Sequence, residues 1–119
     1  MKIIDKRQHP RIDSLNLISY VCIDENNIDV MQGMGRTLNV SEGGILLETH
    51  IQIDLKYTLS LTIGLEEDLI EIKGEVAHSK PGKDDNFETG VQFIEKDEEA
   101  LRVLNKYIKA FKEQFKTTP

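Results

Sequence analysis

The sequence predicts an all-β fold with a terminal helix: a small six-stranded antiparallel β-barrel followed by a C-terminal α-helix. The first observation behind this prediction is a series of short apolar stretches, several with period-two alternation, that are separated by turn residues up to residue 94. The second is a change of the apolar period to three and four residues beyond that point, which is typical of an amphipathic helix. Because 119 residues support one core but not two, we expect a single domain over residues 1–119.

The β-rich part of the chain, residues 14–94, divides into six expected strands. In the clearest of them Tyr57, Leu59 and Leu61 begin an alternation with small polar residues, as in a half-buried strand. Gly33 and Gly35 fall inside the second strand and predict a bulge or sharp curvature there. The expected strands are 14–23, 28–38, 45–48, 57–65, 70–76 and 87–94.

The last part of the chain, residues 97–116, predicts one amphipathic helix. Asp97 is a suitable N-cap, and the acidic residues that follow it lie beside the positive end of the helix dipole. We expect the apolar stripe of this helix to close one end of the barrel, and pairing with another chain is the alternative. The stripe consists of Leu101, Leu104, Ile108, Phe111 and Phe115.

Composition and charge restrict the class of function. A net charge of −6 and an aromatic content of 6% disfavour binding to a nucleic-acid polymer, which uses basic surfaces and stacking platforms. The lone Cys22 excludes an intramolecular disulfide, and no apolar run is long enough to span a membrane. The first residues lack the apolar core of a signal peptide, so we expect a cytoplasmic protein.

No arrangement of residues in the sequence predicts catalysis or metal binding. The chain offers no nucleophile–base pair and no carboxylate dyad, so we expect a protein that is not an enzyme. His50 and His78 lack the spacing of metal ligands, and we expect neither a metal nor a cofactor. The acidic stretch 66–68 is interpreted as a hairpin tip rather than as a divalent-ion site.

A basic cluster near the start of the chain is the first candidate ligand site. It has the form R-x-x-x-R, in which Arg7 and Arg11 flank a segment that Pro10 disfavours as regular helix. Guanidinium forks suit phosphate and the O6/N7 edge of guanine. His9 lies between the arginines and can stack on a base, and a solvated loop residue is the alternative. For the motif by itself, the alternative is a chance spacing.

A second polar cluster follows the second expected strand and has the form N-x-S-x-x-G. The Asn39 amide can pair with a purine edge, and Ser41 can donate to a phosphate oxygen. Gly43 and Gly44 allow backbone N–H groups to face the same anion. A tight turn between strands is the alternative interpretation. Arg36 lies close in sequence and is a candidate source of further positive potential.

The two motifs together resemble the signatures of PilZ domains. Residues 89–93, Thr-Gly-Val-Gln-Phe, are similar to the last-strand pattern of that family, and the resemblance covers residues 6–94. It implies a six-stranded PilZ-like barrel that binds the bacterial second messenger cyclic di-GMP. The ligand-binding residues that the resemblance implies are Arg7, Arg11, Asn39, Ser41 and Gly44.

Four further residues are candidate ligand contacts, namely Lys6, His9, Gly43 and Arg36. Lys6 occupies the position before the first arginine, which in this family influences whether one ligand or a stacked pair binds. The second motif of the family begins with Asp or Asn. Asn39 lacks the charged acceptor that Asp would offer to the N1–H and N2–H groups of guanine, which bears on affinity.

The resemblance implies a non-enzymatic cyclic di-GMP receptor that signals to an unidentified protein partner. In the mechanism that we expect, residues 1–13 form a flexible arm that becomes ordered over the ligand and creates a new surface for the partner. The alternative is a nucleotide-independent PilZ-like protein-interaction module. We expect a monomer or a weak homodimer. Motility, polysaccharide secretion and virulence are typical outputs of the family, and nothing in the sequence selects one.

Overall fold

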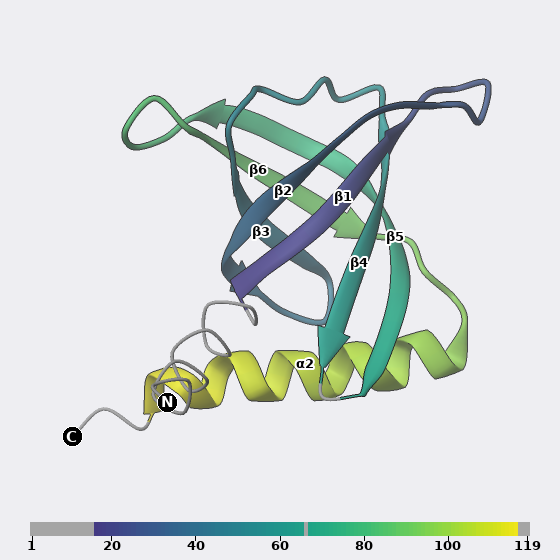
Figure 1. The fold of residues 1–119 in the computed structure, drawn as a ribbon, viewed down its shortest axis with the longest axis vertical. Coiled ribbons are helices and arrows are strands. Elements are labelled where there is room, and N and C mark those ends of the chain that lie inside the picture. Colours follow the sequence, from purple (N-terminus) through teal and green to yellow (C-terminus); the bar gives the residue numbers. More distant parts are fainter. Residues whose placement is uncertain (1–15, 66, 117–119) are drawn as a thin grey trace, which may run out of the picture.

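The computed structural model describes residues 16–65 and 67–116, in which six antiparallel strands close into a barrel with a helix across one end (Figure 1). Around the barrel the strand order is β1-β2-β3-β6-β5-β4, and β4 pairs back with β1. The elements are β1 Leu17–Ile23, β2 Asp29–Val40, β3 Gly44–Thr49, β4 Thr58–Leu65, β5 Asp68–Pro81, β6 Phe87–Phe93 and α2 Glu98–Lys116.

The predicted barrel with a C-terminal helix is confirmed, although three strands are longer than expected, β3 by one residue at each end and β2 and β5 at their C-terminal ends. β2 continues to Val40 rather than ending at residue 38, and β5 continues to Pro81 rather than ending at residue 76. Both extensions contain a register shift that interrupts the inside–outside alternation of side chains. The period-two signal in the sequence therefore stops before the strand itself ends.

The register shift in β2 is a β-bulge at Leu38. Pairing with β3 shifts between Thr37 and Asn39, so Leu38 is the extra residue. In a regular strand Asn39 would face the same side as Thr37, because side chains alternate with a period of two. Instead Thr37 and Val40 are buried and Asn39 is exposed. The bulge thus turns Asn39 to the outer face of the barrel.

A second bulge has the same effect in β5. Pairing with β6 shifts between Val76 and His78, so Ala77 is the extra residue. Val76 and Ser79 are buried, whereas His78 is exposed. One extra residue in each of two strands therefore moves a polar side chain from the core to the outer face.

No bulge lies at Gly33 or Gly35, because both residues pair with β1 in regular register. Gly33 lies opposite Tyr20, and a side-chain carbon at position 33 would fall 2.7 Å from the Tyr20 hydroxyl oxygen. The glycine in this strand therefore makes room for a buried aromatic ring.

Helix α2 closes one end of the barrel with its apolar stripe (Figure 1). The expected N-cap is present, since the Ala100 N–H donates to Asp97 Oδ2 at 2.9 Å. Leu104, Tyr107 and Phe111 are at most 2% exposed and belong to the core of the barrel. The stripe is therefore used to close the barrel, as expected.

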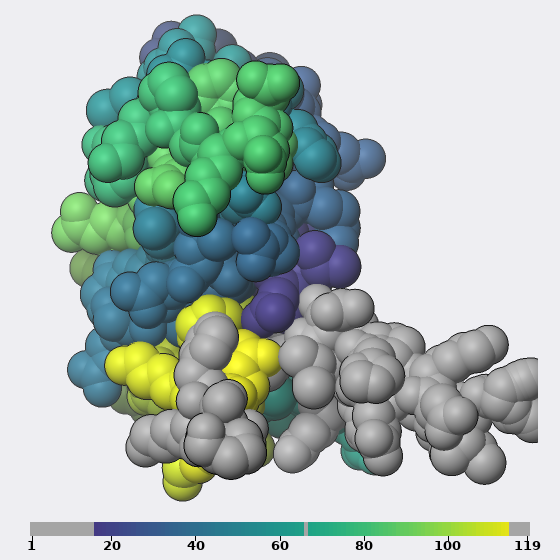
Figure 2. All heavy atoms as spheres, turned by 90° about the vertical axis from the view of Figure 1, so that its left-hand side faces the viewer, coloured from purple at the N-terminus to yellow at the C-terminus, as the bar shows by residue number. Residues whose placement is uncertain are grey.

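A buried hydrogen bond joins the helix to β2. The hydroxyl oxygens of Tyr107 and Thr37 are 2.9 Å apart, and both residues are buried. Burial raises the pKa of Tyr107 to about 12, and the hydrogen bond to Thr37 opposes part of this rise. Figure 2 shows the C-terminal part of α2 (yellow) below strands β2 and β3 (blue). The helix is thus fixed close to the strand that carries Asn39.

Three buried hydroxyl groups form a hydrogen-bonded chain near the connection from β3 to β4. Thr49 Oγ1 donates to the Ile51 carbonyl at 2.8 Å and therefore accepts from Thr89 at 3.0 Å. Thr89 in turn accepts from Ser79 at 2.8 Å, and Ser79 accepts the Ile53 N–H at 3.0 Å. Because each hydroxyl has one proton, the donor and the acceptor are fixed in every hydrogen bond of this series.

Three further properties of the described ranges concern membrane spans, metal ligands and the cysteine. Within residues 16–65 and 67–116, no helix is both long enough and apolar enough to cross a membrane. No group of three or more His, Cys, Asp or Glu side chains in those ranges could hold a metal ion. Cys22 is buried, and burial raises its pKa to about 11, so its thiol stays protonated and unreactive at neutral pH.

Candidate functional site

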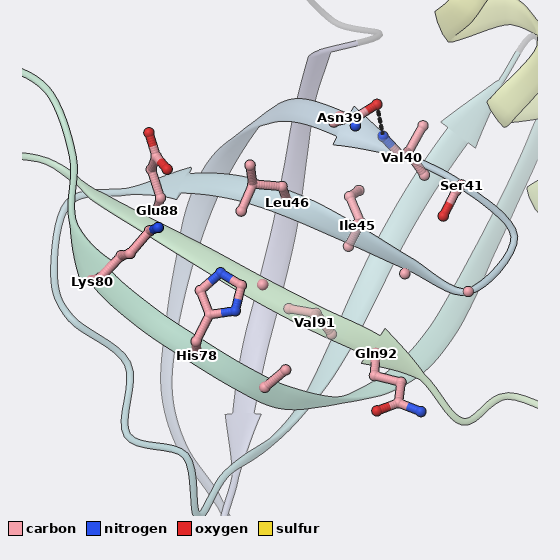
Figure 3. Close-up of a pocket in the computed structure, with 14 residues that line it drawn as sticks. Asn39, Val40, Ser41, Ile45, Leu46, His78, Lys80, Glu88, Val91 and Gln92 are labelled. Carbon is pink, nitrogen blue, oxygen red and sulfur yellow. Dashed lines mark hydrogen bonds between the residues drawn. The ribbon is translucent and has the colours of Figure 1, made fainter.

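The outer face of the barrel carries an open cleft of about 420 Å³ over β2, β3, β6 and β5 (Figure 3). On one side the lining comes from the end of β2 and the turn that follows it, with Asn39, Ser41 and Gly43. On the other side it comes from β6 and β5, with His78. In Figure 3 Leu46 lies between these two sides. The second predicted motif therefore forms one wall of the cleft.

Asn39 reaches the cleft because the Leu38 bulge turns it outward. Its Oδ1 accepts the N–H of Val40 at 2.9 Å, which is the dashed line in Figure 3. This bond orients the side-chain amide, because its oxygen can accept and its nitrogen cannot. The two amide hydrogens of Asn39 are left to donate to a ligand, and they suit acceptors such as O6 and N7 of guanine.

A tight turn joins β2 to β3 beside Asn39. The Ser41 N–H donates to the Gly44 carbonyl at 2.8 Å, and the Phe93 N–H donates to the Gly43 carbonyl at 3.0 Å. The Ser41 side chain is exposed and lines the cleft, where its hydroxyl can donate to an anionic oxygen. The motif is therefore a turn, as the alternative interpretation expected, and the same turn lines the cleft.

The two adjacent glycines of this turn have different reasons to be glycine. A side-chain carbon at Gly44 would fall 2.5 Å from the Val91 carbonyl oxygen, so close packing of β3 on β6 requires a glycine there. A side-chain carbon at Gly43 would meet no described atom within 4 Å. Neither glycine has a positive φ. Gly43 is thus free of a structural requirement among the described residues, and its backbone faces open space in the cleft.

A row of four residues crosses the floor of the cleft. Asn39 pairs with Leu46, Leu46 with Gly90, and Gly90 with His78. Sequence reasoning considered His78 only as a metal ligand and did not include Leu46. A signal was nonetheless present, since the alternation of apolar residues breaks directly after Val76, at the position where the β5 bulge falls.

Three further polar residues line the cleft and were also missed by sequence reasoning, namely Lys80, Glu88 and Gln92. Lys80 and Glu88 pair directly across β5 and β6, so opposite charges face each other at that end of the cleft. Exposed polar residues on the outer face of a strand look alike in a sequence. Only the pairing of distant strands brings these residues together.

Arg36 lies on β2 at the next outward-facing pair from Asn39, opposite Glu48. Its Nε is 3.1 Å from Glu48 Oε1, and it lines a separate cavity of about 220 Å³. The positive charge of Arg36 is therefore matched by a neighbouring carboxylate. The remaining predicted site residues fall outside the described ranges: Lys6, Arg7, His9 and Arg11.

Comparison with known protein families gives one match. The model of the PilZ domain family matches residues 5–110, which is most of the 119-residue chain. No curated protein matches the chain. PilZ domains are cyclic di-GMP-binding modules, and they act as receptors rather than as enzymes. Both the motifs and the barrel agree with this match, and the chain belongs to the PilZ domain family.

Proposed function

We propose that this chain is a non-enzymatic receptor for cyclic di-GMP, which binds in the cleft lined by Asn39, Ser41 and Gly44 and is clamped by Arg7 and Arg11. The observation that carries the proposal is the position of the second motif. Its side chains and its open Gly43 backbone converge on one wall of a cleft of about 420 Å³. Family membership supplies the identity of the ligand.

Each group on this wall has a fitting role toward a guanine dinucleotide. The Asn39 amide hydrogens donate to an acceptor on the edge of one guanine, and Oδ1 keeps a second lone pair beside its bond to the Val40 N–H. The Ser41 hydroxyl and the Gly43 N–H donate to a phosphate oxygen. Two donor sets on one wall thus match a base edge and a phosphate of the same ligand.

The length of chain before β1 is compatible with a clamp by the two arginines. β1 begins at Leu17, which pairs with Arg36 on the strand that carries Asn39. Arg11 lies six positions before Leu17, and a six-residue step of extended chain spans up to about 20 Å. Arg7 and Arg11 then grip guanine edges and phosphates from the N-terminal side, with Lys6 and His9 as further contacts.

Signalling follows from the order that the ligand imposes on the arm of residues 1–13. When the arginines close over the ligand, the arm and the cleft together form a surface that a protein partner recognises. Hydrogen exchange of residues 1–13, measured with and without cyclic di-GMP, tests this step. Equal exchange in both states would contradict ordering, although binding itself could persist.

Isothermal titration calorimetry with cyclic di-GMP tests the receptor function, with GTP and cyclic di-AMP as ligand controls. A charge-assisted hydrogen bond contributes about 1.5–3 kcal/mol, and micromolar binding is only about 8 kcal/mol in total. We therefore expect Arg7→Ala or Arg11→Ala to weaken binding by roughly tenfold to a hundredfold without unfolding the protein. The exposed Arg102 on α2 provides the matched control, Arg102→Ala, which should bind normally.

Ser41→Ala tests the described wall in the same assay, with Ser19→Ala on β1 as its control. We expect weaker binding only for Ser41→Ala, because Ser41 lines the cleft. The fitted stoichiometry distinguishes one ligand from a stacked pair. Absence of heat and of any shift in melting temperature with a folded wild-type chain would refute the receptor and favour a nucleotide-independent interaction module.

A further inference from the structure

The two bulges of the barrel place two polar side chains at opposite ends of one row. The bulge at Leu38 turns Asn39 outward on β2, and the bulge at Ala77 turns His78 outward on β5. Between them the pairing runs through β3 and β6, so both side chains line the same cleft. Bulges next to functional sites commonly re-aim a side chain. Asn39 belongs to the family motif. His78 also follows a bulge and lines the same cleft, but the motif assigns it no role.

The imidazole ring of His78 lies flat over Gly90. A side-chain carbon at position 90 would fall 2.3 Å from Cε1 of His78 and 2.8 Å from each of its two ring nitrogens. The added carbon would thus lie above Cε1 and equally far from both ring nitrogens. These distances are those of an atom placed over the face of the ring, so one face of the imidazole lies against the glycine. In Figure 3 the imidazole is seen face-on near Val91. The other face is open to the cleft, since His78 is exposed and lines it.

We propose that this open face of His78 is the stacking platform for one base of the ligand, at the end of the row opposite Asn39. The inference rests on the proposed function, because it assigns a residue to the same cleft. A π face accepts any purine by stacking, and Leu46 adds an apolar surface beside it. The absence of a side chain at Gly90 leaves room for the ring in this orientation.

The length of the row explains why a dinucleotide suits the cleft. Asn39 and His78 are three strand spacings apart, which is about 14 Å across the sheet. A single purine does not cover that span, whereas a ligand with two guanines reaches both ends. Asn39 therefore reads the edge of one base while His78 stacks on the other. A mononucleotide contacts one end at a time and binds more weakly.

The absence of tryptophan from this chain allows a direct test. In His78→Trp the single indole reports on the platform, and titration with cyclic di-GMP should quench and shift its fluorescence while affinity is kept or improved. His78→Ala should weaken cyclic di-GMP binding about 5- to 150-fold, the range given by loss of one base–aromatic stack. His50→Ala is the control, because His50 lines the separate cavity and bonds Asn86.

Gly90→Ala provides a second variant that keeps the imidazole but displaces it, since its new carbon would overlap the ring. It should weaken binding in the same direction as His78→Ala, at a melting temperature still well above that of the assay. Normal binding by the wild type together with unchanged affinity in folded His78→Ala and Gly90→Ala overturns the platform alone. No binding of cyclic di-GMP by the wild type overturns the receptor function and the platform with it.

Discussion

The helix-closed end of the barrel and the outer cleft make opposite use of the same strand. β2 directs Thr37 inward to the buried Tyr107 and then, beyond the Leu38 bulge, directs Asn39 outward to the cleft. At the helix end the core contacts are apolar and buried, and α2 adds polar contacts that include the Tyr107–Thr37 and Gln114–Asn16 hydrogen bonds and the Lys106–Asp68 ion pair. Along the cleft the polar side chains are exposed, except that of Glu88, which is half-buried. Residues that hold the fold together and residues that face a ligand are therefore separate sets on adjoining positions.

This separation predicts which property each substitution changes. Changes at the helix end should lower the free energy of unfolding, and they should affect binding only by unfolding the protein. Changes to the exposed side chains of the cleft should lower affinity at constant stability. A substitution that alters both properties would indicate coupling between the two regions through β2.

The largest expected effect is at the helix end, where Leu104 is 1% exposed in the core. Leu104→Ala removes buried methyl groups and leaves a cavity, so we expect a loss of about 2–5 kcal/mol in the free energy of unfolding. Urea denaturation measures it, and Asn105→Ala at the exposed neighbouring position is the control. A loss below about 0.5 kcal/mol would show that α2 is not part of the cooperative core.

Alkaline pH should weaken the same end through Tyr107. Its pKa is raised from 10.0 to about 12 in the folded protein, so the folded state holds the phenolic proton more tightly than the unfolded state does. This contribution is complete below pH 10 and is lost as the pH rises toward 12, by roughly 2.7 kcal/mol for two pKa units. Cys22 adds a further loss that begins near pH 9, because burial raises its pKa from 9.0 to about 11.

Melting temperatures recorded from pH 8 to pH 12 measure this decline, and Tyr107→Phe separates its sources. The variant should lose about 1 kcal/mol at neutral pH with the hydrogen bond to Thr37, and it should decline less above pH 10. An identical decline in variant and wild type would assign the whole effect to other groups.

The adjacent glycines of the turn sharpen the comparison within the cleft. Gly44→Ala pushes against the Val91 carbonyl and should cost about 1–3 kcal/mol of unfolding free energy. Gly43→Ala meets open space and should change stability by less than about 0.5 kcal/mol, yet it should weaken cyclic di-GMP binding. Calorimetry and urea denaturation on both variants measure the two effects. Strong destabilisation by Gly43→Ala would contradict the conclusion that a side chain at position 43 points into open space.

The smallest effect is expected in the turn between β5 and β6, which belongs to neither region. Asp84 and Asp85 have φ values of 54° and 64°, and the Asn86 N–H donates to the Lys83 carbonyl at 2.9 Å. Such a type I′ turn prefers glycine at its second central position. Asp85→Gly should therefore raise the free energy of unfolding by up to about 1 kcal/mol, as measured by urea denaturation. Asp85→Ala keeps the strain and should not stabilise.

The regular parts of the fold could be predicted because their signals are local. Leu59 and Leu61 alternate with polar residues and are completely buried, and Asp97 caps the helix as its sequence position indicates. The bulges at Leu38 and Ala77 could not be predicted. An extra residue breaks the apolar–polar alternation, and the sequence alone does not show at which residue pairing with the neighbouring strand resumes. The ends of β2 and β5 were missed for the same reason.

The candidate site shows the same division. Asn39 and Ser41 stand in one short motif, and both line the cleft. His78 joins them only through the pairing of β2 with β3, β3 with β6 and β6 with β5. That register is a long-range property of the closed barrel. Sequence reasoning therefore found the wall made by one turn and missed the wall made by distant strands.

The chain of buried hydroxyl groups has a consequence for the connection between β3 and β4. Exposed connections of this kind are the preferred sites of proteolytic cleavage, because a protease needs an extended, unbonded backbone. Here Ile53 is fully buried and its N–H is bonded to Ser79, while the Ile51 carbonyl is bonded to Thr49. A protease therefore cannot draw residues 51–53 into its active site until Thr89 and its neighbours separate, so cleavage within these residues reports on opening of the barrel itself.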